Sequence, residues 1–159
     1  MGRASSDLVG EGLKFEAFYS EPMQVVARPG HPLVKRRAPP LARLAGEQWI
    51  VPTPEAAYRQ RLEAAFRQAG VEPPRCIVES TSILTNIALV RETDMLAVMP
   101  RDVAQQYSSL GLVRTVSVKM PAPSGPVGVV TVAGRTLPPA AVDLIQALRQ
   151  VASELKRGA

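Results

Sequence analysis

The chain has 159 residues, of which 46% are hydrophobic and only 4% are aromatic. This length suits one domain, or two small lobes that share a core, and the core must be aliphatic. So few aromatic rings argue against a platform on which single-stranded nucleic acid stacks its bases. The formal net charge of +5 permits only a weak attraction to nucleic acid. The basic clusters at 35–37 and 156–157 are expected to be a solvated loop and a helix C-terminus.

The residue inventory offers little catalytic or metal-binding chemistry. Cys76 is the only cysteine, so no internal disulfide can form. His31 is the only histidine, and no cysteine or carboxylate cluster has the spacing of metal ligands, so we expect no metal and no other cofactor. A nucleophile needs an oriented base, and Cys76 lies in a strand that is predicted to be buried. Neither a phosphate-binding nor a dinucleotide-binding glycine motif is present, and we expect no enzyme activity.

Targeting and membrane signals are missing from the sequence. The first twenty residues lack the apolar segment of a secretory signal. No apolar run approaches the roughly 20 residues that a membrane-spanning helix needs. We therefore expect a cytoplasmic protein that has no membrane partner.

The expected elements alternate between strands and helices, which predicts an α/β layer architecture. Residues 1–12 are small and polar and are expected to be disordered. Residues 120–128 are rich in proline and glycine and are expected to be a connector. The final helix is expected to have one apolar face, lined by Leu144, Leu148, Val151 and Leu155. In chain order we expect strands at 13–18 and 23–28, a helical turn at 41–44, a strand at 49–51, a helix at 53–70, a strand at 76–78, a helix at 83–90, a strand at 95–99, a helix at 100–111, strands at 112–118 and 129–133, and a helix from 139.

The stretch from Arg75 to Pro100 predicts a strand–helix–strand unit. Its first strand is a short β-branched apolar run, its helix repeats apolar residues at helical spacing, and its second strand is apolar at every position. Strands buried on both faces are typical of parallel sheets. In such sheets, ligands bind beyond the carboxyl ends of the strands. The first strand of this unit ends at the polar cluster Ser80, Thr81 and Ser82.

These three adjacent hydroxyl residues are the main candidates for ligand contact. One of them is expected to cap the following helix, but three exceed what a cap needs. Ser80, Thr81 and Ser82, together with the free N–H groups of the helix start, predict a small pocket for an anion or a carboxylate.

Two further pairs of residues are weaker candidates. Thr53 and Pro54 are expected to begin the next helix over and to face the same cleft, with capping alone as the alternative. Val127 and Gly128 are expected to line a hinge, where glycine permits close approach of the backbone. A plain loop glycine is the alternative for Gly128.

A set of segments, taken in order, resembles the effector-binding domain of LysR-type transcriptional regulators. The resemblance covers about Leu13 to Leu155, which is nearly the whole chain. The segments that carry it are EPMQVVARPGHPL at 21–33, WIVP at 49–52, the glycine-ended helix to Gly70, the VES-T-S stretch at 78–82 and LAVMPRDVA at 96–104.

The resemblance implies a fold like that of the type II periplasmic binding proteins. One complete α/β lobe and part of a second would be joined by two crossing strands, at 23–27 and 127–131. The expected division is a disordered leader at 1–12, a partial first lobe with hinge strands at 13–27 and 128–157, and a second, effector-binding lobe at 28–127. The family's effectors touch the helix start that follows Ser80.

The implied function is to sense a small-molecule metabolite and to transmit its binding to a DNA-binding domain. The family's N-terminal helix-turn-helix is absent from this chain, so DNA is expected as a partner only through missing residues. Self-association as a dimer or tetramer is also implied. The alternatives are a solute-binding protein of the same fold, an enzyme on this fold, and a truncated fragment without a function of its own.

Overall fold

The computed structural model describes residues 2–3, 12–119 and 125–157. The chain divides into two compact units: unit 1 comprises residues 1–21 and 124–159, and unit 2 comprises residues 22–123. The first boundary falls between Glu21 and Pro22 because the strands on either side of it belong to different sheets. Residues 23–27 therefore lie in unit 2, whereas the sequence analysis grouped them with the first lobe.

Unit 2 is built on a five-stranded sheet with the order β5-β4-β6-β3-β7. β4 pairs in parallel with β5 and β6, whereas β3 pairs antiparallel with β6 and β7. The strand–helix–strand unit predicted for 75–100 is confirmed, and β4 lies between its two strands. The strands are β3 (Met23–Ala27), β4 (Trp49–Val51), β5 (Cys76–Glu79), β6 (Leu96–Pro100) and β7 (Arg114–Val116).

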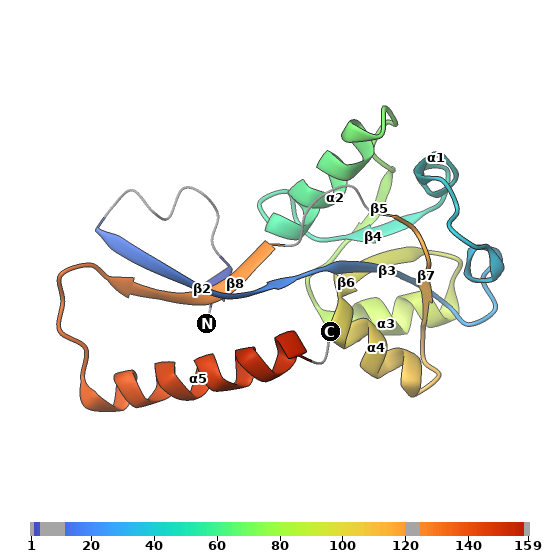
Figure 1. The fold of residues 1–159 in the computed structure, drawn as a ribbon. Coiled ribbons are helices and arrows are strands. Elements are labelled where there is room, and N and C mark those ends of the chain that lie inside the picture. The colour runs from blue at the N-terminus through green and yellow to red at the C-terminus, as the bar shows by residue number, and fades with distance from the viewer. Residues whose placement is uncertain (1, 4–11, 120–124, 158–159) are drawn as a thin grey trace. The chain divides into compact units, whose positions relative to one another are not determined.

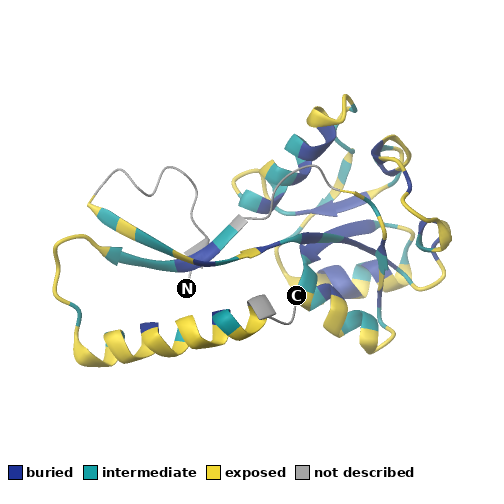
Figure 2. Cartoon of the chain, in the orientation of Figure 1, coloured by how far each residue is buried: buried dark blue, intermediate teal, exposed yellow. Residues whose placement is uncertain are grey.

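Helices cover both faces of this sheet (Figure 1). Successive strand residues point to opposite faces, so Trp49 packs with Phe66 of α2 on one face and Ile50 packs with Val90 of α3 on the other. Figure 2 shows that the buried residues of unit 2 concentrate in the sheet and on the helix faces turned toward it. The helices are the 3-10 helix η2 (Pro32–Lys35), α1 (Leu41–Ala45), α2 (Ala57–Gln68), α3 (Ile83–Glu92) and α4 (Arg101–Ser109).

Glycines end two of these helices where the sequence predicted it. Gly70 has a φ of 69° after α2, and Gly111 has a φ of 72° after α4. The next N–H group reaches back in each case, from Val71 to the Phe66 carbonyl and from Leu112 to the Tyr107 carbonyl, both at 3.0 Å. Glycine adopts this left-handed conformation without steric cost, which is why it is common just after helices.

β5 is an edge strand, which corrects the prediction of a strand buried on both faces. Ile77 is 41% exposed, and Cys76 is only partly buried. Because β5 pairs with β4 alone, its outer side lacks a neighbouring strand within the described residues. A short apolar run is compatible with a central strand or an edge strand, so the sequence does not separate the two.

Unit 1 contains a three-stranded antiparallel sheet with the order β1-β8-β2. β1 (Gly2–Arg3) lies within the predicted disordered leader, and residues 4–11 of that leader lie outside the described residues. β2 spans Leu13–Glu21. β8 spans Gly125–Val132, so it begins inside the stretch predicted to be a connector, of which 120–124 also lie outside the description.

α5 (Pro139–Arg157) packs on this sheet through a stripe that shares only Leu148 with the predicted one. Ile145, Leu148 and Ala152 contact the cluster around Phe18 and Val129. By contrast, exposed fractions are 60% for Leu144, 53% for Val151 and 43% for Leu155. The helix carries apolar residues on two adjacent stripes, and their spacing does not show which stripe meets the sheet.

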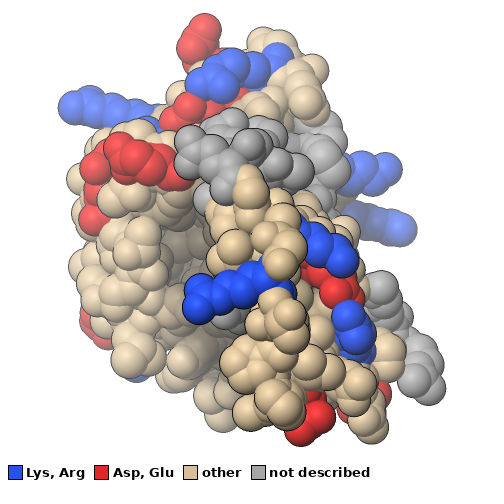
Figure 3. All heavy atoms as spheres, turned by 90° about the vertical axis from the view of Figure 1, so that its left-hand side faces the viewer, with Lys and Arg blue, Asp and Glu red and all other residues tan. Residues whose placement is uncertain are grey.

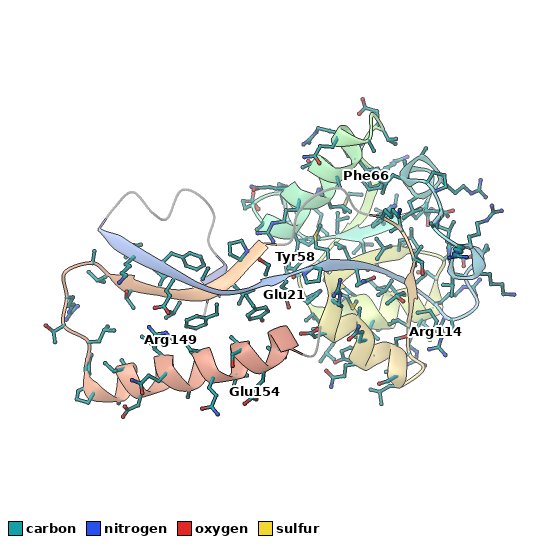
Figure 4. The ribbon with its side chains drawn as sticks, in the orientation of Figure 1. Glu21, Tyr58, Phe66, Arg114, Arg149 and Glu154 are labelled. Atoms are coloured by element: carbon teal, nitrogen blue, oxygen red, sulfur yellow. The ribbon has the colours of Figure 1, made fainter. Side chains whose placement is uncertain are left out.

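An ion pair also ties α5 to β2 within unit 1. Arg149 of α5, labelled in Figure 4, donates from Nε and Nη2 to the two carboxylate oxygens of Glu16, at 2.6 Å and 2.8 Å. These hydrogen bonds lower the pKa of Glu16 below its usual value. Neither α5 nor any other described helix is long and apolar enough to cross a membrane.

Candidate functional site

The loops that follow β4 and β5 lie at the same edge of the unit 2 sheet. The two strands are parallel, and Val51 is in register with Glu79. The Ser80 N–H group donates to the Val51 carbonyl at 3.0 Å, which extends the pairing by one residue into the hydroxyl cluster. Thr53 and Pro54, two to three residues beyond β4, therefore follow the strand end to which Ser80 is bonded.

The three hydroxyl residues have different local roles. Ser82 is the N-cap of α3: its Oγ accepts from the Thr85 N–H group at 3.4 Å and from the Thr85 hydroxyl at 3.0 Å. The Oγ of Ser80 accepts from the Ser82 N–H group at 3.2 Å. Thr81 is exposed, and its hydroxyl has no hydrogen-bond partner among the described residues. Two of the three hydroxyls thus hold the backbone, and that of Thr81 stays available.

α2 begins at Ala57, so the predicted helix start at Thr53 is wrong. Ala56 is the N-cap residue and makes no side-chain cap. Its N–H group donates to the Thr53 carbonyl at 2.9 Å, which closes a turn with Pro54 at the second position. Proline suits the second position of a turn as well as the first position of a helix, so the local sequence fits both.

Arg59 is the residue at this edge that the sequence analysis missed. Its Nη1 donates to the Pro52 carbonyl at 3.2 Å and lies 3.7 Å from a carboxylate oxygen of Glu79. Its Nε pairs with Glu63 one helical turn further along α2. Arg59 therefore links the loop after β4 to the end of β5. In the sequence, Arg59 and Glu63 have the spacing of an ordinary ion pair on a solvated helix, which hid this role.

The electrostatics of this network keep both partners charged. The hydrogen bond from Arg59 is the main cause that lowers the pKa of the Glu63 carboxyl below its usual 4.5, with a smaller contribution from Arg67. The same bond raises the pKa of the Arg59 guanidinium. The Arg59 side chain is only 17% exposed. We assign it a positioning role at the strand ends, because its hydrogen-bonding groups face the protein's own carbonyl and carboxylates.

Val127 and Gly128 lie in β8 of unit 1, and both are buried. Gly128 is not a plain loop residue, because it pairs with Gly2 of β1 and Ala17 of β2. A Cβ atom at this position would lie 2.0 Å from the Glu16 carbonyl oxygen. Close approach of the neighbouring strand therefore gives this glycine a structural reason of its own.

Taken together, the edge at β4 and β5 offers hydrogen bonds rather than reactive groups. It presents the Thr81 and Thr53 hydroxyls, the N–H groups at the start of α3, and the paired Arg59. No group of three or more His, Cys, Asp or Glu side chains within the described ranges is arranged to hold a metal ion. Such an arrangement can bind a small polar molecule at the carboxyl ends of parallel strands.

Comparison with known proteins gives one matching family and several relatives. A family model described as the LysR substrate binding domain matches residues 3–153. The HTH-type transcriptional regulator GbpR of Azospirillum brasilense is 33% identical over 157 residues, which cover 98% of this chain and 46% of that protein. The HTH-type transcriptional regulator GalR of Pseudomonas putida is 33% identical over 151 residues, which cover 94% of this chain and 36% of that protein. The chain thus spans less than half the length of these two relatives.

Two solved structures share the fold at lower sequence identity. The regulatory domain of Synechocystis CcmR, in complex with 2-PG, matches with a TM-score of 0.80 and 18% identity over 96% of this chain and 71% of that one. The effector-binding domain of QuiR, in complex with shikimate, matches with a TM-score of 0.72 and 17% identity over 90% of this chain and 66% of that one.

Proposed function

Because the chain belongs to the family of LysR substrate-binding domains, we propose that it senses a small-molecule effector for a transcriptional regulator. Its fold is of the type II periplasmic-binding-protein kind, with a complete α/β lobe in unit 2 and part of a second lobe in unit 1. The relatives reported above are HTH-type transcriptional regulators, which favours a regulator over a solute-binding protein or an enzyme.

The proposed effector site is the edge of unit 2 formed by the ends of β4 and β5. The main support for this site is that the three hydroxyl residues make different hydrogen bonds. Ser80 and Ser82 bond to the backbone at the start of α3, whereas the exposed Thr81 hydroxyl has no partner among the described residues. A hydroxyl that neither caps nor packs is free to bond a ligand.

The backbone next to Thr81 supports the same site. Four N–H groups at a helix start lack partners within the helix. The Ser82 hydroxyl accepts from the backbone N–H group of Thr85. The backbone N–H groups of Ile83 and Leu84 have no acceptor in the described part of the chain. With the partial positive charge of the helix start, these donors favour an acceptor such as a carboxylate or a sugar hydroxyl. Glu79, half-exposed at 50%, disfavours a ligand with several negative charges.

Thr53 and Pro54 are proposed to border the effector from the β4 side. Both are exposed, and the Thr53 hydroxyl has no hydrogen bond within the described ranges. Arg59 holds this loop in place through its hydrogen bond to the Pro52 carbonyl. Val127 and Gly128 belong to unit 1. We propose them as further effector contacts, as the sequence predicts.

The proposed mechanism is a shift between two arrangements of the lobes. An effector can shift such an equilibrium only by as much as its affinity differs between the two states. In a whole regulator, this shift would reach a DNA-binding part that lies outside the present chain. We expect that regulator to act in the cytoplasm as a homodimer or homotetramer, with DNA contacted through its helix-turn-helix part.

The test is a thermal-shift screen of aromatic acids, amino acids and sugars, followed by titration of each compound that raises the Tm. Thr81→Val keeps the shape of the side chain and removes the hydroxyl. We expect it to weaken binding of such a compound by about tenfold, the worth of one hydrogen bond to a charged group. Thr136→Val, at an exposed threonine of unit 1, is the matched control. Equal affinity of Thr81→Val and the parent protein would remove the hydroxyl cluster from the site.

A further inference from the structure

A concave basic surface lies on unit 2 beside the proline-rich loop. Arg36, Arg37 and Arg43 line one hollow of about 380 Å³ together with 38–40. A second hollow of about 540 Å³ shares residues 38–40 with the first. Its remaining lining residues are Leu41, Gln68, Ala69 and Lys119. We call the two hollows together the basic trough.

The arginines of the basic trough lack neutralising partners. Residues 31–46 include no aspartate or glutamate. The guanidinium groups of Arg36, Arg37 and Arg43 form no ion pair with any described residue, whereas Arg28, Arg59, Arg67 and Arg149 each bond a carboxylate. On the face drawn in Figure 3, basic and acidic side chains are interspersed. Like charges that share one hollow repel each other, and an anion that binds there relieves the repulsion.

The frame that carries these arginines is well anchored. Leu33 and Leu41 are buried in the main core cluster on either side of the loop. The Nδ1 atom of His31 accepts from the Leu33 N–H group at 3.2 Å and so caps η2. Ala38 has a φ of 50°, the one positive value at a non-glycine residue in the described ranges, and Pro39 after it is buried. A loop that is already ordered costs less free energy to fix around a ligand.

The basic trough is far from the proposed effector site within the same unit. Gln68 and Ala69 lie at the C-terminal end of α2, whereas Arg59 and the loop after β4 lie at its N-terminal end. The 12 residues of α2 separate the two ends by about 18 Å. Binding at the basic trough can therefore be tested separately from binding at the proposed effector site.

We propose that the basic trough is a second ligand site, for a small organic anion that carries at least two negative charges and an apolar group. Guanidinium groups form paired hydrogen bonds to phosphate and carboxylate oxygens, and three arginines are among the residues that line the first hollow. The adjoining hollow presents Pro39, Pro40, Leu41 and Ala69 to an apolar group, with Lys119 at its border. Both volumes fall within the range of small-molecule sites.

The experiment measures binding of phenyl phosphate to the full chain by calorimetry, with the contact residues mapped by amide chemical shifts. Inorganic phosphate is the probe for charge alone, and benzyl alcohol is the probe for the apolar group alone. We expect phenyl phosphate to bind at least tenfold more tightly than either, with shifts at 36–43 and 68–69. Shifts at 80–85 instead, or equal affinity for inorganic phosphate, would overturn the proposal.

A pair of triple variants provides the matched control. One variant replaces Arg36, Arg37 and Arg43 by glutamine, and the other replaces the exposed Arg75, Arg91 and Arg135. Both remove three positive charges, so they have the same net charge. We expect at least a tenfold loss of phenyl phosphate affinity in the first variant and little change in the second. Equal losses would mean that the net charge alone attracts the anion.

Two further measurements keep this test decisive. The single variant Arg43→Gln retains two trough arginines and should lose a smaller part of the affinity, so it serves if the triple variant folds poorly.

Duplex DNA is titrated in parallel at two salt concentrations. If the triple variant at Arg36, Arg37 and Arg43 loses affinity for duplex DNA while it keeps the parent's affinity for phenyl phosphate, the surface is a nucleic-acid contact and our proposal is wrong.

Discussion

Replacing Gly128 by alanine tests why a glycine stands within β8. The added Cβ atom would lie 2.0 Å from the Glu16 carbonyl oxygen and 2.9 Å from the Ala17 Cα atom. Real Cβ atoms essentially never come closer than 3.0 Å to such neighbours, so the two strands must separate by about 1 Å at this point. Both contacts are with backbone, which has no alternative rotamer to adopt.

The expected cost follows from what this separation breaks. Overpacking costs about 1–3 kcal/mol, and each ladder hydrogen bond that is lost adds about 1 kcal/mol. We therefore expect Gly128→Ala to destabilise unit 1 by about 3 kcal/mol. Gly134→Ala provides the contrast: Gly134 has a φ of 72° with nothing within 4 Å of its Cβ position, so only the conformational cost of about 1 kcal/mol applies.

Urea unfolding with two signals checks this prediction. Far-ultraviolet circular dichroism follows the whole chain, including α5 of unit 1. Fluorescence follows Trp49, the only tryptophan, which lies in unit 2. If the midpoints of Gly128→Ala and Gly134→Ala agree, contact between the strands is not what requires the glycine. A stable Gly128→Ala protein that fails to bind an effector would instead support the interpretation of Gly128 as a ligand-contacting residue.

Three further predictions concern unit 2 and use the same unfolding assay. Ser82→Ala removes the cap of α3 and should lower the free energy of unfolding by about 1 kcal/mol. Thr81→Val should change it by less than about 0.5 kcal/mol. Similar losses in both variants would contradict the different roles of Ser82 and Thr81. Glu63→Gln removes a carboxyl whose pKa is lowered below 4.5 in the folded state, mainly by the hydrogen bond from Arg59. A lowered pKa stabilises the fold above the unfolded-state value, so the variant should be less stable at pH 7 by about 1 kcal/mol, and this difference should shrink as the pH falls below 4.5. A constant difference across that range would show that the ion pair is not its source. Ala38→Gly relieves a left-handed residue with a φ of 50° and should raise stability by up to about 1 kcal/mol; a loss of stability would indicate that the Ala38 methyl group packs favourably.

Several features of this chain were predictable because they depend on residues close in sequence. The left-handed glycines at Gly70 and Gly111 follow apolar helical repeats, and both end helices as predicted. The strand at Trp49–Val51 and the hydroxyl-rich start of α3 were likewise evident from the sequence. The ordered set of segments that resemble LysR-type regulators added the fold class, which the family match and the solved structures show.

Other predictions failed because two local patterns were equally compatible with the sequence. Pro54 suits a turn as well as a helix start, and the structure has the turn. The apolar run around Ile77 suits a central strand as well as an edge strand, and β5 is at the edge. The two apolar stripes of α5 are both long enough to pack, and only the one through Ile145 meets the sheet.

The sequence by itself determined the type and order of most strands and helices, because turn, capping and periodicity signals act within a few residues. Tertiary structure alone decided which faces are covered and which distant side chains meet. Arg59 reaches the end of β5 only because two parallel strands end at one edge. Such meetings depend on how far-apart segments pack, and no local pattern of residues encodes them.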